Sequence, residues 1–133
     1  MLSKEEAKER VRELVEDFKS IPKEELDKKS EDQIRVEFID SLFEALGWNM
    51  RKDAERNEQI FRGRADYILK LNNKNVLVIE AKKTSVKLSE EDSKQAVVYA
   101  HNKHIQFCVL TNFKQIRIYH ALSNPRETEK NLL

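Results

Sequence analysis

The feature that most constrains the fold is an uninterrupted apolar run at residues 76–79, which ends in Glu80-Ala81-Lys82. A short run that is apolar at every position is typical of a strand buried on both faces of a sheet. Because side chains alternate along a strand, Glu80 and Lys82 point to the same face. Burying ionised groups costs on the order of several kcal/mol per ion, so packing alone gives no reason for this pair. The pattern predicts a functional site at the end of a central strand.

Composition limits the class of protein further. The chain has 133 residues, of which 37% are charged and 39% hydrophobic, which suits one domain with a modest core. Its net charge of +1 gives no overall basic character for nucleic-acid binding. Cys108 is the single cysteine, which excludes a disulfide framework and a cysteine-rich zinc site. Without a signal peptide or a long apolar segment, we expect a cytoplasmic protein that does not contact a membrane.

The periodicity of apolar residues predicts a mixed α/β domain in the order α-α-α-β-β-β-α-β-β, with a central mixed sheet of about five strands flanked by helices. Expected helices cover 3–18, 23–27, 30–46 and 89–102, with caps at Ser3, Ser30 and Ser89. Expected strands cover 48–51, 59–61, 66–71, 76–82, 105–111 and 115–121, the first two forming a hairpin around a polar loop at 52–58. We expect residues 1–29 to be a helical extension, 30–122 the core, and 123–133 a polar tail or linker.

A second acidic residue precedes the apolar run. Asp66 closes Gly63-Arg64-Ala65-Asp66-Tyr67, fourteen residues before Glu80 and at the start of the neighbouring predicted strand. Two carboxylates and an ammonium at adjacent strand ends suit a divalent cation and a phosphodiester, since hard cations prefer oxygen ligands. A structural alternative is that Asp66 simply pairs with Arg62 or Arg64.

Helix geometry selects one carboxylate from the segment that follows Ser30. At about 100° per residue, one sector of this helix collects the apolar side chains Ile34, Phe38, Leu42, Ala45 and Leu46. Glu31 and Arg35 fall inside that sector, whereas Glu37, Asp40 and Glu44 face solvent. Glu31 is therefore the acid that can approach the sheet. Its alternative role is limited to the favourable charge of the first helical turn.

The helix that follows Ser89 carries a second polar group. Gln95 and Tyr99 are four residues apart and share a face, with Glu91 and Asn102 nearby. A Gln and a Tyr side by side can hydrogen-bond a phosphate, a base edge or a metal-bound water. In the structural alternative, Tyr99 packs on the sheet with its hydroxyl at the rim and Gln95 is solvated.

Basic residues flank the acids. Arg62, Arg64, Lys83 and Lys87 lie on either side of them in the sequence, where they can clamp a phosphate backbone. In a chain with this share of charged residues, the same flanks are also ordinary solvated surface. The three histidines show no metal-ligand spacing, and we expect them at the surface or rim of the fold.

Together these segments resemble the PD-(D/E)xK nuclease superfamily. Within it they are most similar to the N-terminal nuclease domain of type I restriction-enzyme motor subunits and of related fused restriction–modification enzymes. The resemblance covers roughly residues 30–121 and keeps the family's order, through segments at 30–35, 45–48, 63–67, 79–82 and 95–100. Ala65 stands where the superfamily's name has proline, a position that often varies.

The resemblance implies a restriction-endonuclease-like core and a Mg²⁺-dependent deoxyribonuclease, with Mn²⁺ as a substitute. Asp66 and Glu80 would hold the cation, with the Ala81 carbonyl as a third oxygen ligand. Lys82 would orient or help to deprotonate the attacking water and offset charge on the phosphate. Glu31 would complete the outer shell of the metal or bind a second ion.

The resemblance also bears on partners. Gln95 and Tyr99 match the Gln-x-x-x-Tyr motif of one branch and would support the site or contact DNA. No motor, methyltransferase or target-recognition segment is present in the sequence, so we expect other domains or subunits to choose the DNA target. Two alternatives stay open: a stand-alone structure-specific nuclease such as a junction resolvase, which implies a homodimer, and a catalytically silent DNA-binding or assembly module.

Overall fold

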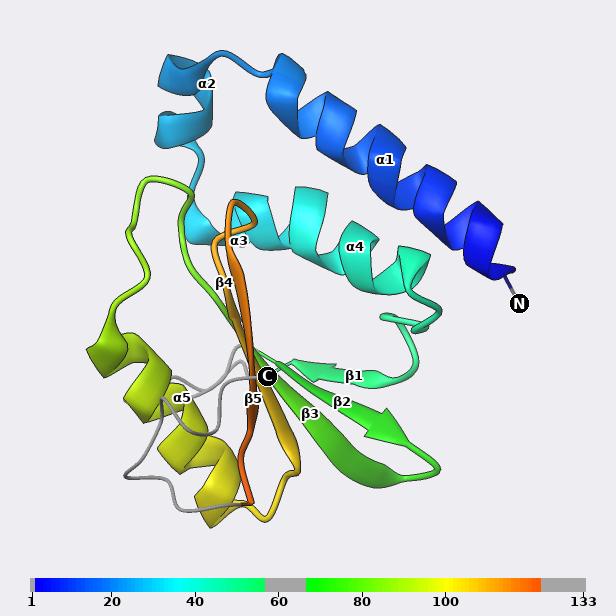
Figure 1. The fold of residues 1–133 in the computed structure, drawn as a ribbon, viewed down its shortest axis with the longest axis vertical. Helices are drawn as coiled ribbons and strands as arrows, with labels where there is room; N and C mark the ends of the chain where they lie inside the picture. The colour runs from blue at the N-terminus through cyan, green and yellow to red at the C-terminus, as the bar shows by residue number, and fades with distance from the viewer. Residues whose placement is uncertain (1, 57–66, 123–133) are drawn as a thin grey trace.

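The computed structural model describes residues 2–56 and 67–122 of the chain. Helices come first, followed by a sheet that is interrupted by one helix (Figure 1). The helices are α1 (Lys4–Ser20), α2 (Lys23–Lys28), α3 (Glu31–Ile34), the π-helix η1 (Arg35–Ile39), α4 (Asp40–Ala45) and α5 (Glu90–Asn102). The strands are β1 (Ala54–Arg56), β2 (Tyr67–Leu71), β3 (Lys74–Ala81), β4 (Phe107–Thr111) and β5 (Ile116–His120). The α/β class and the order of elements are confirmed.

The five described strands form one sheet in the order β1-β2-β3-β4-β5. Only the central pair is parallel: β3 and β4 are joined by the crossover through α5, whereas the other neighbours are antiparallel. A parallel pair needs such a crossover because a short turn cannot return the chain to the same end of the sheet. The predicted mixed sheet is therefore confirmed, with β3 at its centre.

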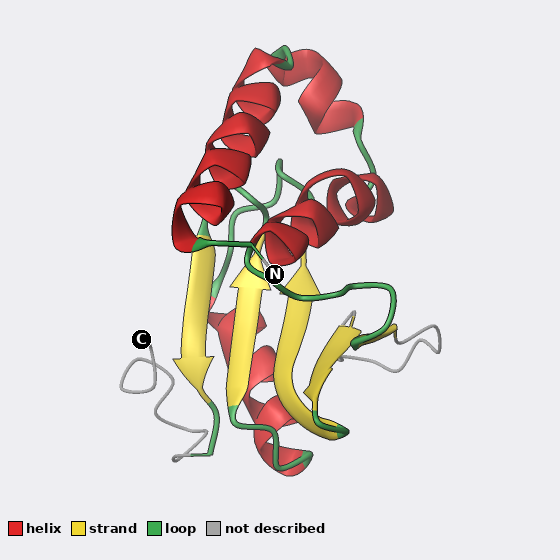
Figure 2. Ribbon diagram, turned by 90° about the vertical axis from the view of Figure 1, so that its right-hand side faces the viewer, coloured by secondary structure: helices red, strands yellow, loops and turns green. Residues whose placement is uncertain are grey.

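Helices cover both faces of the sheet (Figures 1 and 2). On one face, Val78 of β3 packs in a cluster with Ala96, Val97 and Ala100 of α5. On the opposite face, Ile79 of β3 packs in a second cluster with residues of α2, α3, η1 and α4. Alternation along β3 sends neighbouring side chains into the two clusters, which explains why its run is apolar at every position.

Three serine caps begin helices as predicted. Ser3, Ser30 and Ser89 each accept a hydrogen bond from the backbone N–H three residues later. Such caps satisfy one of the donors that the first helical turn leaves unpaired, so the signal is local to the sequence. In the described part of the chain, no helix combines the length and apolar character needed to cross a membrane.

The predicted hairpin at 48–61 is wrong in its first arm and its loop. Residues 48–51 form no strand, since 48 and 49 are irregular and 50 and 51 belong to a turn. Strand β1 lies inside the segment predicted as loop, and residues 59–61 lie outside the described part. Asn49 explains the difference. Its carbonyl accepts from the backbone N–H of Asp53 at 2.7 Å, and its side chain accepts from that of Lys52 at 3.0 Å. These local bonds satisfy the backbone in a turn and compete with strand pairing.

The predicted apolar face of the third helix is wrong at Leu46, which is 56% exposed. The cause is η1, where the Asp40 N–H bonds the Arg35 carbonyl five residues earlier. A π-helical turn takes up an extra residue, so the positions after it rotate relative to an ideal α-helix. Ile39 and Phe43 consequently enter the core, whereas the predicted burial of Ile34, Phe38, Leu42 and Ala45 is confirmed.

Candidate functional site

The end of β3 brings an acid and a base together. Glu80 is 6% exposed and lies, with Val78, on the face covered by α5. Lys82 follows two residues later, and its Nζ lies 3.4 Å from Glu80 Oε1. The Lys82 N–H donates to the Thr111 carbonyl at 2.8 Å, which ties this segment to the end of β4. A buried carboxylate and an ammonium therefore share one rigid strand end.

Carboxylates from two helices act on the same ammonium. Asp92 of α5 places its Oδ1 3.9 Å from Lys82 Nζ, and the charge of Glu31 at the start of α3 also acts on Lys82. Burial lowers the pKa of Lys82, but attraction to Glu80, Asp92 and Glu31 outweighs burial and leaves that pKa raised. Lys82 is thus a charged group at neutral pH, surrounded by acids from three elements.

Several predicted site residues lie outside the described part of the chain: Asp66, Arg62 and Arg64. The described strand that follows them begins at Tyr67, whose partner across the sheet is Ile79. Tyr67 is fully buried, and the guanidinium carbon of Arg35 lies 5.8 Å from the centre of its ring. The beginning of β2 is therefore held firmly beside the residue that precedes Glu80.

Gln95 and Tyr99 share a side of α5 but occupy different environments. Gln95 is exposed, and its Nε2 donates to Glu91 Oε1 at 3.4 Å. Tyr99 is half-buried against the cluster that packs α5 on the sheet. Because Asp92 is three residues before Gln95 and seven before Tyr99, the three share one side of α5, and the contact with Lys82 is made by Asp92.

Lys83 and Lys87 are exposed in the loop between β3 and α5. Buried side chains anchor this loop, since Thr84 and Leu88 are 3% and 2% exposed. Asn112, after β4, donates from Nδ2 to the Val86 carbonyl at 2.9 Å. The two lysines are therefore exposed residues of an anchored loop that begins directly after β3.

Asp92 is the site residue that sequence reasoning missed. Its spacing from Gln95 and Tyr99 is visible in the sequence, but its position after Ser89 explains it equally well as a first-turn acid. Its approach to Lys82 depends on the loop between β3 and α5, whose path no local pattern predicts. The contact arises from the packing of α5 on the sheet beside β3.

The oxygen atoms at the end of β3 are of the chemical type that divalent cations prefer as ligands. Glu80 supplies a buried carboxylate, and the Ala81 carbonyl follows it at a fully buried position. Within residues 2–56 and 67–122, however, no three His, Cys, Asp or Glu side chains form a group that could hold a metal ion. The described residues therefore offer part of a ligand set, to which Asp66 would have to contribute.

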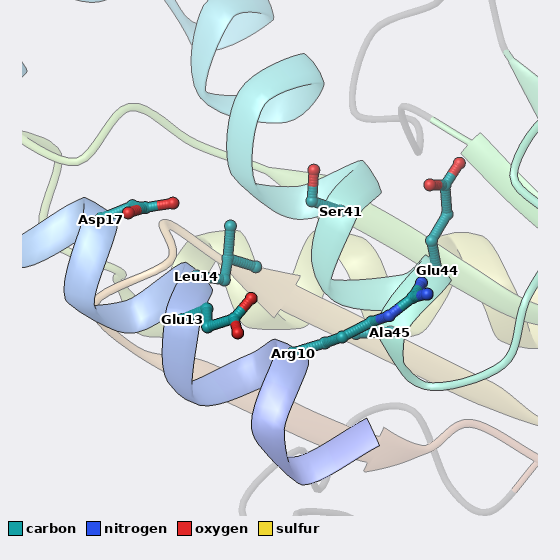
Figure 3. Close-up of a pocket in the computed structure, with 7 residues that line it drawn as sticks. All are labelled: Arg10, Glu13, Leu14, Asp17, Ser41, Glu44 and Ala45. Atoms are coloured by element: carbon teal, nitrogen blue, oxygen red, sulfur yellow. The ribbon is translucent and has the colours of Figure 1, made fainter. Parts of the chain in front are cut away.

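A separate pocket lies between α1 and α4 (Figure 3). Its lining combines charged, polar and apolar side chains, with three acids and one arginine: Arg10, Glu13, Leu14, Asp17, Ser41, Glu44 and Ala45. None of these residues belongs to the group around Lys82. The pocket therefore gives no reason to move the candidate site away from the end of β3.

Comparison with known proteins gives a family match over the part of the chain that contains Glu80, Lys82 and Asp92. Residues 30–131 match the family described as type I restriction enzyme R protein N terminus. The chain is also 30% identical, over 140 aligned positions, to the type II restriction enzyme and methyltransferase RM.Eco57I of Escherichia coli. That alignment covers 92% of this chain but only 14% of the relative. No solved structure gave a significant match.

Proposed function

This chain belongs to the family of type I restriction enzyme R protein N termini, and we propose that it is a metal-dependent DNA endonuclease domain. The observation that carries the proposal is the buried Glu80 with Lys82 beside it at the end of β3. A scaffold gains nothing from a buried carboxylate at this position, because its desolvation opposes folding. A nuclease needs such a group to bind a cation and an ammonium to face the phosphate.

We assign the second acid of the site to Asp66. It directly precedes Tyr67, and Tyr67 pairs with Ile79, which directly precedes Glu80. The role that we propose for Asp66 is that of the second carboxylate ligand of the cation, beside Glu80.

Mg²⁺, or Mn²⁺ in its place, would be held by Asp66, Glu80 and the Ala81 carbonyl, with Glu31 in the outer shell or at a second ion. When bound, the cation supplies an activated water and stabilises charge on the phosphate. Lys82, kept charged by its acidic neighbours, offsets the negative charge that develops on the phosphate during hydrolysis. Gln95 and Tyr99 line the α5 side of the site, where they support it or contact DNA.

We propose that target choice comes from other domains or subunits. The chain spans only about one seventh of the length of its restriction–methyltransferase relative. Its net charge of +1 gives little non-specific attraction to DNA, so Lys83, Lys87, Arg62 and Arg64 would form a local clamp only. Motor, methyltransferase and specificity functions would be supplied by the remainder of a larger cytoplasmic enzyme.

The proposal is tested by nicking of supercoiled plasmid in Mg²⁺ or Mn²⁺. Asp66→Ala and Lys82→Met should each reduce the nicking rate at least about 100-fold, because each removes a group that acts on the transition state. Lys74→Met is the matched control, since Lys74 is an exposed lysine at the opposite end of β3. Equal nicking by all variants would show that the activity is not this protein's. DNA binding without nicking by wild type would favour a silent binding module.

A further inference from the structure

We infer that Asp92 is a positioning residue of this site, which holds the Lys82 ammonium in place through their ion pair. The inference rests on the proposed nuclease function and adds a residue to it. Lys82 Nζ lies between two carboxylates, 3.4 Å from Glu80 Oε1 and 3.9 Å from Asp92 Oδ1. Both Lys82 and Asp92 are largely buried, with side chains 24% and 23% exposed, so solvent screens the contact only in part.

The carboxylates of Glu80 and Asp92 would have different roles once a cation is bound. Glu80 is the proposed cation ligand, so its negative charge would be shared with the cation once one is bound. Lys82 would then lose most of its attraction to Glu80. Asp92 lies on α5, outside the strand ends that would hold the cation, and would remain as the counter-ion that keeps the ammonium beside the phosphate.

Asp92 is itself held in a fixed place. Its own N–H donates to Ser89 Oγ at 3.0 Å, within the cap of α5. The next residue, Ser93, is fully buried and its Oγ accepts from Arg117 Nη1 at 3.0 Å and from the Tyr119 hydroxyl at 2.8 Å. Arg117 Nη2 also donates to the Leu88 carbonyl at 3.2 Å. Hydrogen bonds from β5 therefore hold the first turn of α5, and Asp92 with it, in a fixed position. A carboxylate held in this way can orient the flexible side chain of Lys82.

The test compares two acids from the same helical turn. Asp92→Asn removes the counter-ion, and Glu90→Gln is the control, because Glu90 is an exposed first-turn acid of α5. Both variants lose one charge near the helix start, so dipole effects cancel in the comparison. We expect Asp92→Asn to slow single-turnover plasmid nicking about ten-fold with DNA affinity unchanged. Asp92→Glu should restore much of the rate, and Glu90→Gln should leave it unchanged.

A second readout does not depend on activity. The ¹⁵N-lysine-labelled protein is free of metal and DNA and carries Glu80→Gln in every sample, so that Asp92 is the carboxylate left beside Lys82. The side-chain ammonium signal of Lys82 is assigned by its loss in Lys82→Met. Relaxation of that signal should show a more mobile ammonium in Asp92→Asn and no change in Glu90→Gln. Slower nicking without a change in Lys82 mobility would overturn the inference, as would equal nicking by both variants. If wild type does not nick but Lys82 still loosens in Asp92→Asn, the proposed function fails instead, and the ion pair has no reaction to assist.

Discussion

Lys82 places its ammonium 3.4 Å from the Glu80 carboxylate, two residues along from it at the end of β3. Glu80 is almost fully buried, whereas Lys82 keeps about a quarter of its side chain in solvent. The pair therefore spans the boundary between the core and the surface. A ligand bound at this boundary would meet the Glu80 carboxylate on its inner side and the Lys82 ammonium on its outer side.

Glu80→Gln should remove site-specific Mn²⁺ binding, because it replaces a charged oxygen ligand with a neutral amide of the same shape. Loss of an outer-shell partner alone typically weakens metal binding about 10–100-fold, so loss of a direct ligand should exceed ten-fold. Isothermal titration calorimetry with Mn²⁺ measures this, with Glu90→Gln as the control that should bind like wild type. Equal Mn²⁺ affinity in both variants would exclude Glu80 as a ligand.

Ser93→Ala should destabilise the fold by about 1–3 kcal/mol, because it removes the acceptor of the buried Tyr119 hydroxyl. Tyr119→Phe removes the hydroxyl donor itself and leaves Ser93 bonded to Arg117, so its cost should be smaller, about 1 kcal/mol. Urea unfolding followed by circular dichroism gives both values. If Tyr119→Phe lowered the free energy of unfolding more than Ser93→Ala does, Ser93 would not be the residue that anchors α5.

Phe43→Ala and Leu46→Ala separate the observed helix from the one that the sequence predicts. Phe43 is 5% exposed, so its truncation should cost about 3–5 kcal/mol, whereas Leu46 is largely exposed and should change stability by no more than about 0.5 kcal/mol. An unbroken α-helix would instead make Leu46→Ala costly. Thermal or urea unfolding of the two variants decides between the geometries.

The Cys108 thiol should react slowly in the folded protein. Burial, with a smaller contribution from the charge of Glu80, raises the pKa of Cys108 from 9.0 to about 12, and the thiolate is the reactive form. At pH 8, Ellman's reagent should modify the unfolded chain in urea far faster than the native one; equal rates would place Cys108 at the surface. Because the folded state holds this proton more tightly, the thiol's contribution to stability is complete below pH 9 and declines as the pH rises towards 12.

Local patterns predicted those features whose causes lie within a few residues. The serine caps and the apolar run of β3 are of this kind, because capping and strand alternation depend on near neighbours in the chain. The same patterns placed Glu80 and Lys82 on one face, as observed. The roles of Gln95 and Tyr99, and those of Asp66, Arg62 and Arg64 outside the described residues, stay predictions.

The sequence by itself thus determined the class of fold, the central strand and the acid–lysine pair at its end. Tertiary structure decided which helix residues pack against the central strand and contact the acid–lysine pair. The π-helical turn places Phe43 in the core in place of Leu46. The contact between Asp92 and Lys82 likewise joins residues on separate elements. Such contacts depend on how helices pack on the sheet, which is the sum of many distant interactions and leaves no periodic signal in the chain.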